Sequence, residues 1–140
     1  MALVLDTGVL LAGLDEGEPQ HEDCARLLAG IEERLIIPEP VLVELDYWLR
    51  KAANADVWLT FCENLHADAY VLSPVGPDLL LAAAQLQVRY ADQPIGFVDA
   101  AVFVTCEALG EDKVATLDVR DFSILRTSGG QSLRLLPEVG

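Results

Sequence analysis

Cysteine and histidine are scarce in this sequence of 140 residues. The three cysteines, Cys24, Cys62 and Cys106, are far apart, odd in number and form no CxxC pair. This pattern excludes a disulfide framework and favours small buried side chains in a reducing compartment. The two histidines form no HxxxH motif, and the HEDC stretch at 21–24 reads better as a solvated helix start. A zinc site therefore has little support.

Long hydrophobic runs are also missing. No run reaches the roughly 18 residues that a membrane-spanning helix requires. The apolar N-terminus, MALVLDTGVLLAGL, lacks a cationic start and carries Asp6 in its middle, unlike a signal peptide. We therefore expect a cytoplasmic protein. Because hydrophobic residues still make up 52% of the chain and no repeat or linker interrupts it, we expect one domain over residues 1–140.

Basic residues are few: 9 lysines and arginines stand against 23 acids, for a net charge of -14. A surface that holds nucleic acid by charge alone is thereby disfavoured. The balance fits an enzyme that reaches a phosphate through bound cations, and it also suits a basic protein partner. It is equally explained by the need to keep an apolar protein in solution.

Short β-like runs alternate with longer amphipathic ones along the whole chain. This alternation predicts an α/β fold with a mainly parallel sheet between two layers of helices, and sites at the carboxyl ends of the strands. Strands are expected over 2–5, 35–37, 70–72, 113–116 and 133–136. Helices are expected over 7–14, 21–34, 39–53, 55–66, 78–90 and 97–109, with a short one after Asp118.

Two acids, Asp6 and Asp118, directly follow expected strands. This is where open α/β sheets bind ligands. Aspartate is also a preferred N-cap, so each could simply begin the next helix. Asp121, three residues after Asp118, would then complete a weak capping box, and Thr116 supplies a hydroxyl beside it.

Two further acids lie on expected helices. Glu44 falls on or beside an apolar stripe formed by residues 41, 45, 48, 49 and 52, where an unpaired carboxylate would be costly to bury. The alternative is a side chain at the edge of that stripe that reaches solvent. Asp99 is the one acid in the first two turns of a helix that is apolar nearly all round, and a first-turn role with the helix dipole would also explain it.

The joint pattern is more informative than any single acid. Two carboxylates end strands, and two lie on helices that can pack beside those ends. Carboxylates that converge without basic partners repel one another, and hard divalent cations with oxygen ligands, such as Mg²⁺ or Mn²⁺, remove that repulsion. A divalent metal site is therefore the main hypothesis.

At these residues the sequence resembles the PIN-domain ribonucleases, and in particular the VapC-type toxin of a type II toxin–antitoxin pair. The resemblance covers nearly the whole chain, in order and spacing. The matching stretches are VLDTGVLLAGLD, IPEPVLVELDYWL, FVDAAVFVTCEALG and VATLDVRDF. Each is weak alone, but the four in this order are specific.

The resemblance implies a three-layer α/β/α sandwich and an acidic quartet. The quartet would hold Mg²⁺ or Mn²⁺ and falls on Asp6, Glu44, Asp99 and Asp118. Thr7 and Thr116 match supporting hydroxyl positions, and Asp121 is an auxiliary acid. Gly8 departs from the family, where serine or asparagine is common.

The implied reaction is metal-dependent endonucleolytic hydrolysis of RNA. Asp118 or Glu44 would orient the attacking water or take its proton. Arg120 and Arg126 are candidates for positioning the RNA. The resemblance also implies a cognate antitoxin and a homodimer.

Three other readings remain. A receiver-like phosphoacceptor module would need an acid pair after the first strand and an aspartate after the central one, whereas only Asp6 is present and the strand at 70–72 runs into Ser73. A catalytically silent PIN-like binding domain would keep the fold and lose the reaction. A phosphatase of the haloacid dehalogenase type would need an aspartate where Gly8 stands.

Overall fold

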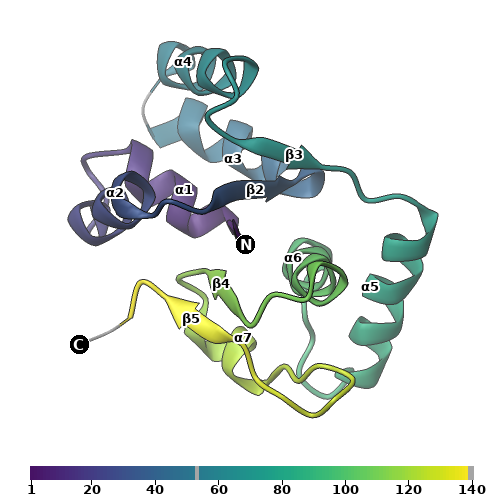
Figure 1. Cartoon of the computed structure of the whole chain (residues 1–140). Helices are drawn as coiled ribbons and strands as arrows, with labels where there is room; N and C mark the ends of the chain where they lie inside the picture. Colours follow the sequence, from purple (N-terminus) through teal and green to yellow (C-terminus); the bar gives the residue numbers. More distant parts are fainter. Residues whose placement is uncertain (53, 139–140) are drawn as a thin grey trace.

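The computed structural model describes residues 1–52 and 54–138 and contains a parallel β-sheet (Figure 1). The strands are β1 (Ala2–Val4), β2 (Arg34–Pro38), β3 (Val71–Ser73), β4 (Lys113–Ala115) and β5 (Arg134–Leu136). Their spatial order is β3–β2–β1 on one side and β4–β5 on the other, and a bridge between Leu5 and Ala115 joins the two halves. Each of these pairings is parallel, as the alternating pattern predicts.

Helices cover both faces of this sheet. Figure 1 shows α3 and α4 on one side of β2 and β3, and α5 and α6 on the other. The helices are α1 (Thr7–Leu14), α2 (His21–Gly30), α3 (Glu39–Ala52), α4 (Ala55–His66), α5 (Pro77–Arg89), α6 (Phe97–Leu109) and α7 (Val119–Ile124). The predicted α/β/α arrangement is therefore confirmed. Within the described residues, no helix is long and apolar enough to cross a membrane.

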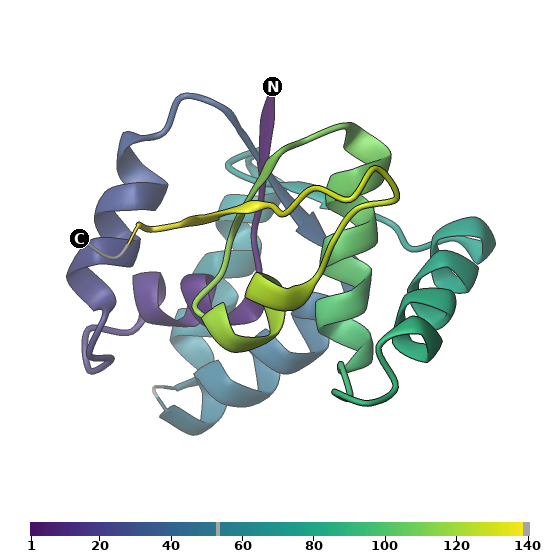
Figure 2. The same ribbon diagram turned by 90° about the horizontal axis from the view of Figure 1, so that it is seen from below.

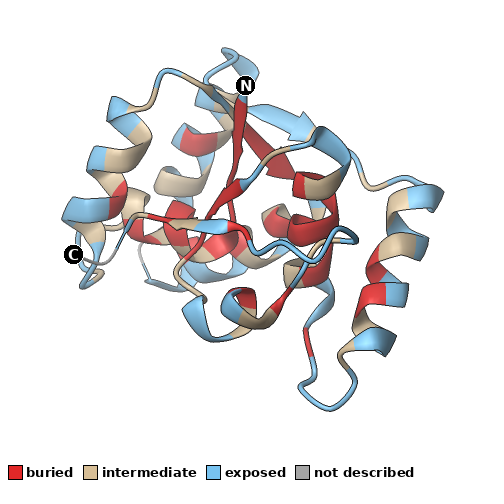
Figure 3. Ribbon diagram, turned by 60° about the horizontal axis from the view of Figure 1, so that its bottom comes forward, coloured by how far each residue is buried: buried red, intermediate tan, exposed pale blue. Residues whose placement is uncertain are grey.

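The core is centred on β1 and α6. Leu3, Val4 and Leu5 are fully buried because β2 and β4 flank β1 on its two sides. In α6 the residues from Ala100 to Cys106 are all buried, which explains why its sequence is apolar nearly all round. Figure 3 shows this distribution: buried residues fill the central strands and the inner turns, and the outer helices are largely exposed. Gly110 ends α6 in the left-handed conformation, with φ 69°, which glycine adopts without strain.

One predicted helix is too long. The sequence predicts a helix over 21–34, but α2 ends at Gly30 and Ile31 is extended, with φ -86° and ψ 135°. Arg34 instead begins β2, where it pairs with Ala2. The other helix bounds agree with the prediction to within one residue, except that Ala53 lies outside the described residues.

The parallel strands bring their carboxyl ends to one edge of the sheet. Asp6 follows β1, and Asp118 follows β4 after two intervening residues. Helices α1, α3, α6 and α7 begin near this edge, which lies in the lower part of Figure 2. The sheet therefore delivers four helix N-termini and two strand ends to one region, which is the geometry from which the candidate site is built.

Candidate active site

The four predicted quartet acids line one cavity. Its volume is about 320 Å³, and it lies at the carboxyl edge of the sheet. The lining residues are Asp6, Thr7, Gly8, Leu11, Glu44, Trp48, Asp99, Leu117 and Asp118. The structure therefore brings together side chains that lie more than a hundred positions apart in the sequence.

Asp6 is the most buried acid of the cavity, with 5% of its surface exposed. Its Oδ1 accepts a hydrogen bond from the Thr7 amide at 2.8 Å, and its Oδ2 accepts one from the Thr116 hydroxyl at 2.8 Å. Burial raises the pKa of Asp6 to about 6, although these two hydrogen bonds lower it, and the charges of Glu44 and Asp118 raise it further. Asp6 is thus the N-cap of α1, as one sequence interpretation expects, and it also lines the cavity.

Glu44 is half-buried on α3 and points into the same cavity. The Thr7 hydroxyl donates to its Oε1 at 2.7 Å. Among the described residues, no hydrogen bond to its Oε2 is found, so that oxygen is available to a ligand. By contrast Asp46, two residues later, pairs with Arg50 outside the cavity.

Asp118 begins α7. Its Oδ1 accepts from the amide of Asp121 at 3.1 Å, and its own amide donates to the Thr116 hydroxyl at 3.0 Å. The capping interpretation is therefore right in its geometry. It does not exclude a role in the cavity, because Asp118 also lines it.

Asp99 completes the site from the first turn of α6. Burial raises the pKa of Asp99 to about 8, and the neighbouring acids Asp118, Asp6 and Asp121 raise it further. One carboxylate oxygen each of Asp99, Asp118 and Asp121 lies within 4.8 Å of the other two. Asp121, expected to be auxiliary, is thus a member of this close group together with two of the quartet acids, Asp99 and Asp118. Burial, followed by the charge of Asp118, raises the pKa of Asp121 as well.

The chemistry of these donors fits a divalent cation. Two overlapping sets of carboxylates share Asp99 and Asp118: the four quartet acids line one cavity, and Asp121 has an oxygen within 4.8 Å of oxygens of Asp99 and Asp118. Within residues 1–52 and 54–138, no ion pair joins any of the five to a lysine, arginine or histidine. Repulsion between uncompensated carboxylates is relieved by hard cations that prefer oxygen ligands. Asp99, Asp118 and Asp121 could each supply a ligand oxygen, with Asp6 and Glu44 in the same cavity.

Trp48 is the lining residue that the sequence interpretation missed. The pattern places it on the buried stripe of α3, but it is 44% exposed and forms a wall of the acid cavity. Val41, Leu45 and Leu49 are the buried residues of α3, and Ala52 is exposed. The signal that would have found Trp48 is its position one turn after Glu44, which places both on one side of the helix.

The two arginines proposed to position RNA differ in availability. The Arg126 guanidinium donates to the carbonyl oxygens of Ser123 and Leu125, at 2.7 and 2.9 Å, so its donors are partly used. Arg120 is exposed at the start of α7, near Asp121, whose pKa it lowers.

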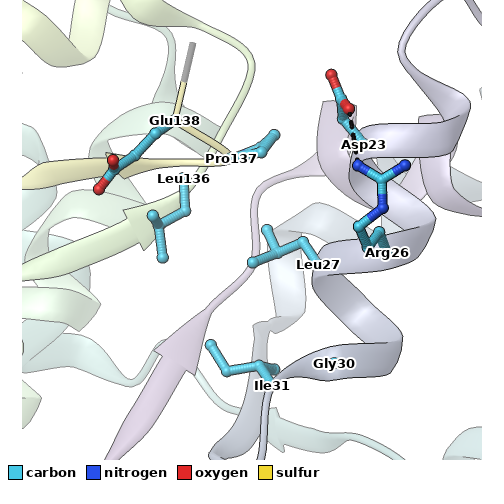
Figure 4. Close-up of a pocket in the computed structure, with 8 residues that line it drawn as sticks. All are labelled: Asp23, Arg26, Leu27, Gly30, Ile31, Leu136, Pro137 and Glu138. Atoms are coloured by element: carbon cyan, nitrogen blue, oxygen red, sulfur yellow. Dashed lines mark hydrogen bonds and ion pairs between the residues drawn. The ribbon is translucent and has the colours of Figure 1, made fainter. Parts of the chain in front are cut away.

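A separate cavity of about 430 Å³ lies between α2 and the end of β5 (Figure 4). Leu27, Ile31, Leu136 and Pro137 form its apolar part, and Asp23 and Arg26 pair at its rim. None of the five site acids lines it.

Comparison with known proteins agrees with this geometry. A family model described as PIN domain matches residues 3–126. Ribonuclease VapC26 of Mycobacterium tuberculosis is 32% identical to this chain over 135 residues, which cover 96% of the chain and 100% of the relative.

Two solved structures share the fold at lower identity. The first is VapC20 of Mycobacterium tuberculosis, described as a sarcin-ricin loop cleaving toxin, with a TM-score of 0.74, 22% identity, and coverage of 81% of this chain and 87% of that one. The second is VapBC2 of Rickettsia felis bound to a DNA fragment from its promoter, with a TM-score of 0.70, 15% identity, and coverage of 96% and 98%. At these identities the two likenesses establish the fold alone.

Proposed function

The chain belongs to the PIN domain family, and on that premise we propose that it is a metal-dependent endoribonuclease and the toxin of a toxin–antitoxin pair. The observation that carries the proposal is the convergence of Asp6, Glu44, Asp99 and Asp118 around one cavity. The name of the VapC26 relative supports RNA as the substrate. Family membership sets the receiver-like alternative aside.

Mg²⁺ or Mn²⁺ is the proposed cofactor, with Asp99, Asp118, Asp121 and Asp6 as the residues that would hold it. When bound, such an ion would neutralise charge on the phosphoryl oxygens and polarise the phosphorus centre. The closeness of the Asp99, Asp118 and Asp121 oxygens supports this assignment, as does the finding that, among the described residues, no base is ion-paired with any of these four acids.

The side chains have separable tasks in this proposal. Thr116 fixes Asp6 and the backbone of Asp118 relative to each other through one hydroxyl. Thr7 holds Oε1 of Glu44, a residue that lines the cavity, and leaves Oε2 without a hydrogen bond among the described residues. We assign Glu44 Oε2 to orient the attacking water and to accept its proton, because the hydroxyl contact fixes the carboxylate without using that oxygen.

The partners follow from the same premise. VapBC2 and a Klebsiella pneumoniae toxin–antitoxin complex are among the structural neighbours, which supports a cognate antitoxin. Exposed apolar side chains on four elements would supply protein contacts, and the net charge of -14 suits a basic partner. They are Val43, Leu59, Val71, Leu72, Leu80, Leu81 and Val88. We also propose that the protein is a cytoplasmic homodimer. Light scattering, which measures the mass in solution, tests the oligomeric state.

The direct test is cleavage of RNA by the purified chain without any partner. Cleavage is expected with Mg²⁺ or Mn²⁺ and not with EDTA. Asp99→Asn and Glu44→Gln should each lower the rate by about a hundred-fold or more, since each removes a group from the reacting centre. Asp56→Asn and Glu63→Gln are matched controls, because both are exposed acids on α4 outside the cavity.

Loss of cleavage in the controls as well would show that the effect of the two site variants is not specific to the cavity. Equal cleavage by wild type, Asp99→Asn and Glu44→Gln would refute the site. A wild-type protein that binds metal and cleaves no RNA would instead support the silent binding domain.

A further inference from the structure

Trp48 has an unusual environment for a large aromatic residue. It is 44% exposed, yet it lines the same cavity as the four carboxylates. We propose that Trp48 is a stacking platform for a nucleobase of single-stranded RNA, next to the phosphate held among the acids. This inference rests on the proposed ribonuclease function and adds a substrate-positioning residue to it.

The neighbouring side chains hold the indole in place. Tyr47 packs edge-on against Trp48, with 5.0 Å between ring centroids and 87° between ring planes. Lys51, one turn further along α3, places its Nζ 5.5 Å from the centroids of both rings. An exposed aromatic pair with a cation beside it therefore adjoins the acid cavity.

This combination matches the chemistry of a nucleotide. Bases of single-stranded RNA stack on aromatic side chains whatever their sequence, and a lysine beside the ring attracts the phosphate that follows. Because the protein carries a net charge of -14, overall electrostatics oppose RNA binding. A stacking contact supplies affinity that does not depend on net charge, which is what such a protein needs.

A protein partner is the competing occupant of this surface. RNA is favoured because Trp48 is continuous with the acid cavity, where a phosphate would lie, and because a cation adjoins the rings. The exposed apolar residues on α4, β3 and α5 offer a separate surface for a protein.

Fluorescence tests the contact directly. The chain has two tryptophans, and Trp58 is half-buried in α4, stacked on Phe61 at 5.6 Å. In a Trp58→Phe protein, Trp48 is the remaining tryptophan, so changes in tryptophan emission report on it alone. We expect a short single-stranded oligoribonucleotide, added with Ca²⁺ in place of Mg²⁺ to slow cleavage, to quench its emission in a saturable manner. If Trp58→Phe does not fold, the difference between wild type and Trp48→Phe gives the same signal.

Kinetics give a second readout. Trp48→Ala is expected to raise KM for a short RNA about ten-fold, with kcat changed by less than about three-fold, because stacking contributes to binding. Trp48→Phe should recover most of this loss. Leu109→Ala truncates a similarly exposed apolar side chain (47% against 44%) at the end of α6, outside the acid cavity; it is the matched control and should leave KM unchanged.

The lysine is tested through salt dependence. Lys51→Ala should lower the slope of log binding constant against log salt concentration by about one, as the loss of one phosphate contact does. Arg89→Ala, an exposed cation at the end of α5, is the control and should not change the slope.

The outcomes separate the two proposals. Wild-type cleavage with an unquenched Trp48 and an unchanged KM in Trp48→Ala would overturn the stacking role and leave the ribonuclease function intact. Quenching by poly-L-lysine and not by RNA would assign the surface to a protein and also overturn it. Saturable quenching by RNA in a wild type that never cleaves would support the platform while the proposed function fails.

Discussion

Thr116 donates its hydroxyl hydrogen to Asp6 Oδ2 over 2.8 Å, although 110 positions separate the two residues. The hydroxyl oxygen of Thr116 in turn accepts a hydrogen bond from the Asp118 amide at 3.0 Å. A single buried hydroxyl thus links the acid that follows β1 to the acid that begins α7, and it sets the separation of two walls of the cavity.

Thr116→Val keeps the shape of this side chain and removes the link. We expect the free energy of unfolding to fall by about 1–2 kcal/mol, because a buried carboxylate and a backbone amide lose a partner. We also expect a clear fall in kcat, while Thr116→Ser should restore both. Urea unfolding and RNA cleavage are the measurements. The control is Thr105→Val, which removes a buried hydroxyl that donates to Ala101 within α6 at 2.7 Å; a similar loss of kcat there would contradict the positioning role.

The raised pKa of Asp99 predicts a stability that falls with pH in metal-free protein. The pKa of Asp99 is about 8 in the folded state and about 4 in the unfolded chain. Between these pH values the folded state therefore binds more protons than the unfolded chain. Its contribution to stability is therefore lost as pH rises through that window. Asp99→Asn should raise the free energy of unfolding at pH 9 by about 1 kcal/mol, after discounting for partial exposure to solvent, and by less at pH 5.

Urea unfolding in EDTA at the two pH values measures this difference. The comparison variant is Asp78→Asn, which removes an exposed acid in the first turn of α5, outside the acid cavity. With Mn²⁺ added, wild type should have a higher free energy of unfolding than Asp99→Asn, because wild type gains stability by binding the ion and the variant gains less. If Asp99→Asn raises the free energy of unfolding by the same amount at pH 5 and pH 9, the charge of Asp99 is ruled out as the cause.

Lys113 is a buried cation far from the acid cavity. Its Nζ lies 2.8 Å from Glu33 Oε2 and 3.3 Å from Glu111 Oε2, and its side chain is 7% exposed. Lys113→Met would leave two partly buried carboxylates facing each other, and we expect a loss of about 3 kcal/mol in the free energy of unfolding. Chemical denaturation is the measurement. Arg134→Met removes the exposed pair with Glu138 and should cost less than about 0.5 kcal/mol, so equal losses would contradict this reading.

Substituting alanine for Gly8 and for Gly110 should change the stability of the protein in opposite directions. A Cβ at Gly8, in α1, would meet only Leu117, at 3.6 Å, which is ordinary contact. Gly8→Ala should therefore stabilise the protein by about 0.5–1 kcal/mol through helix propensity. Gly110→Ala forces a left-handed φ on alanine and should destabilise it by about 1 kcal/mol. Thermal melts check both, and a destabilised Gly8→Ala would show that the cavity needs the glycine.

Much of the fold was predictable because the periodicity of hydrophobic residues indicates the helices and strands, and because the positions where strands end indicate the edge of the sheet. The helices over 7–14, 55–66 and 97–109 agree with their predicted bounds, and the strand after which Asp6 comes is central and buried. Parallel strands end at one edge, so the rule that sites form there places Asp6 and Asp118 together, whereas Glu44 and Asp99, on helices, were added by the resemblance to a known family.

The features that could not be predicted depend on which neighbouring elements pack over a side chain in the folded protein. Periodicity shows which side of α3 is apolar, but not how much of that side a neighbour covers, so Trp48 was placed in the core and is exposed. Composition likewise does not reveal that Asp121 lies beside Asp99, since that closeness depends on how α7 packs against α6. The end of α2 was missed because pairing of Arg34 with Ala2 overrides helical periodicity.

The carboxylates of the cavity come from positions 6, 44, 99 and 118. The last of them follows β4, and the strand that borders β4 is made later still. During synthesis, the nascent chain therefore carries an incomplete set of these acids until residue 118 has been added. In the proposed ribonuclease, the acid cavity is therefore among the last parts of the fold to be completed.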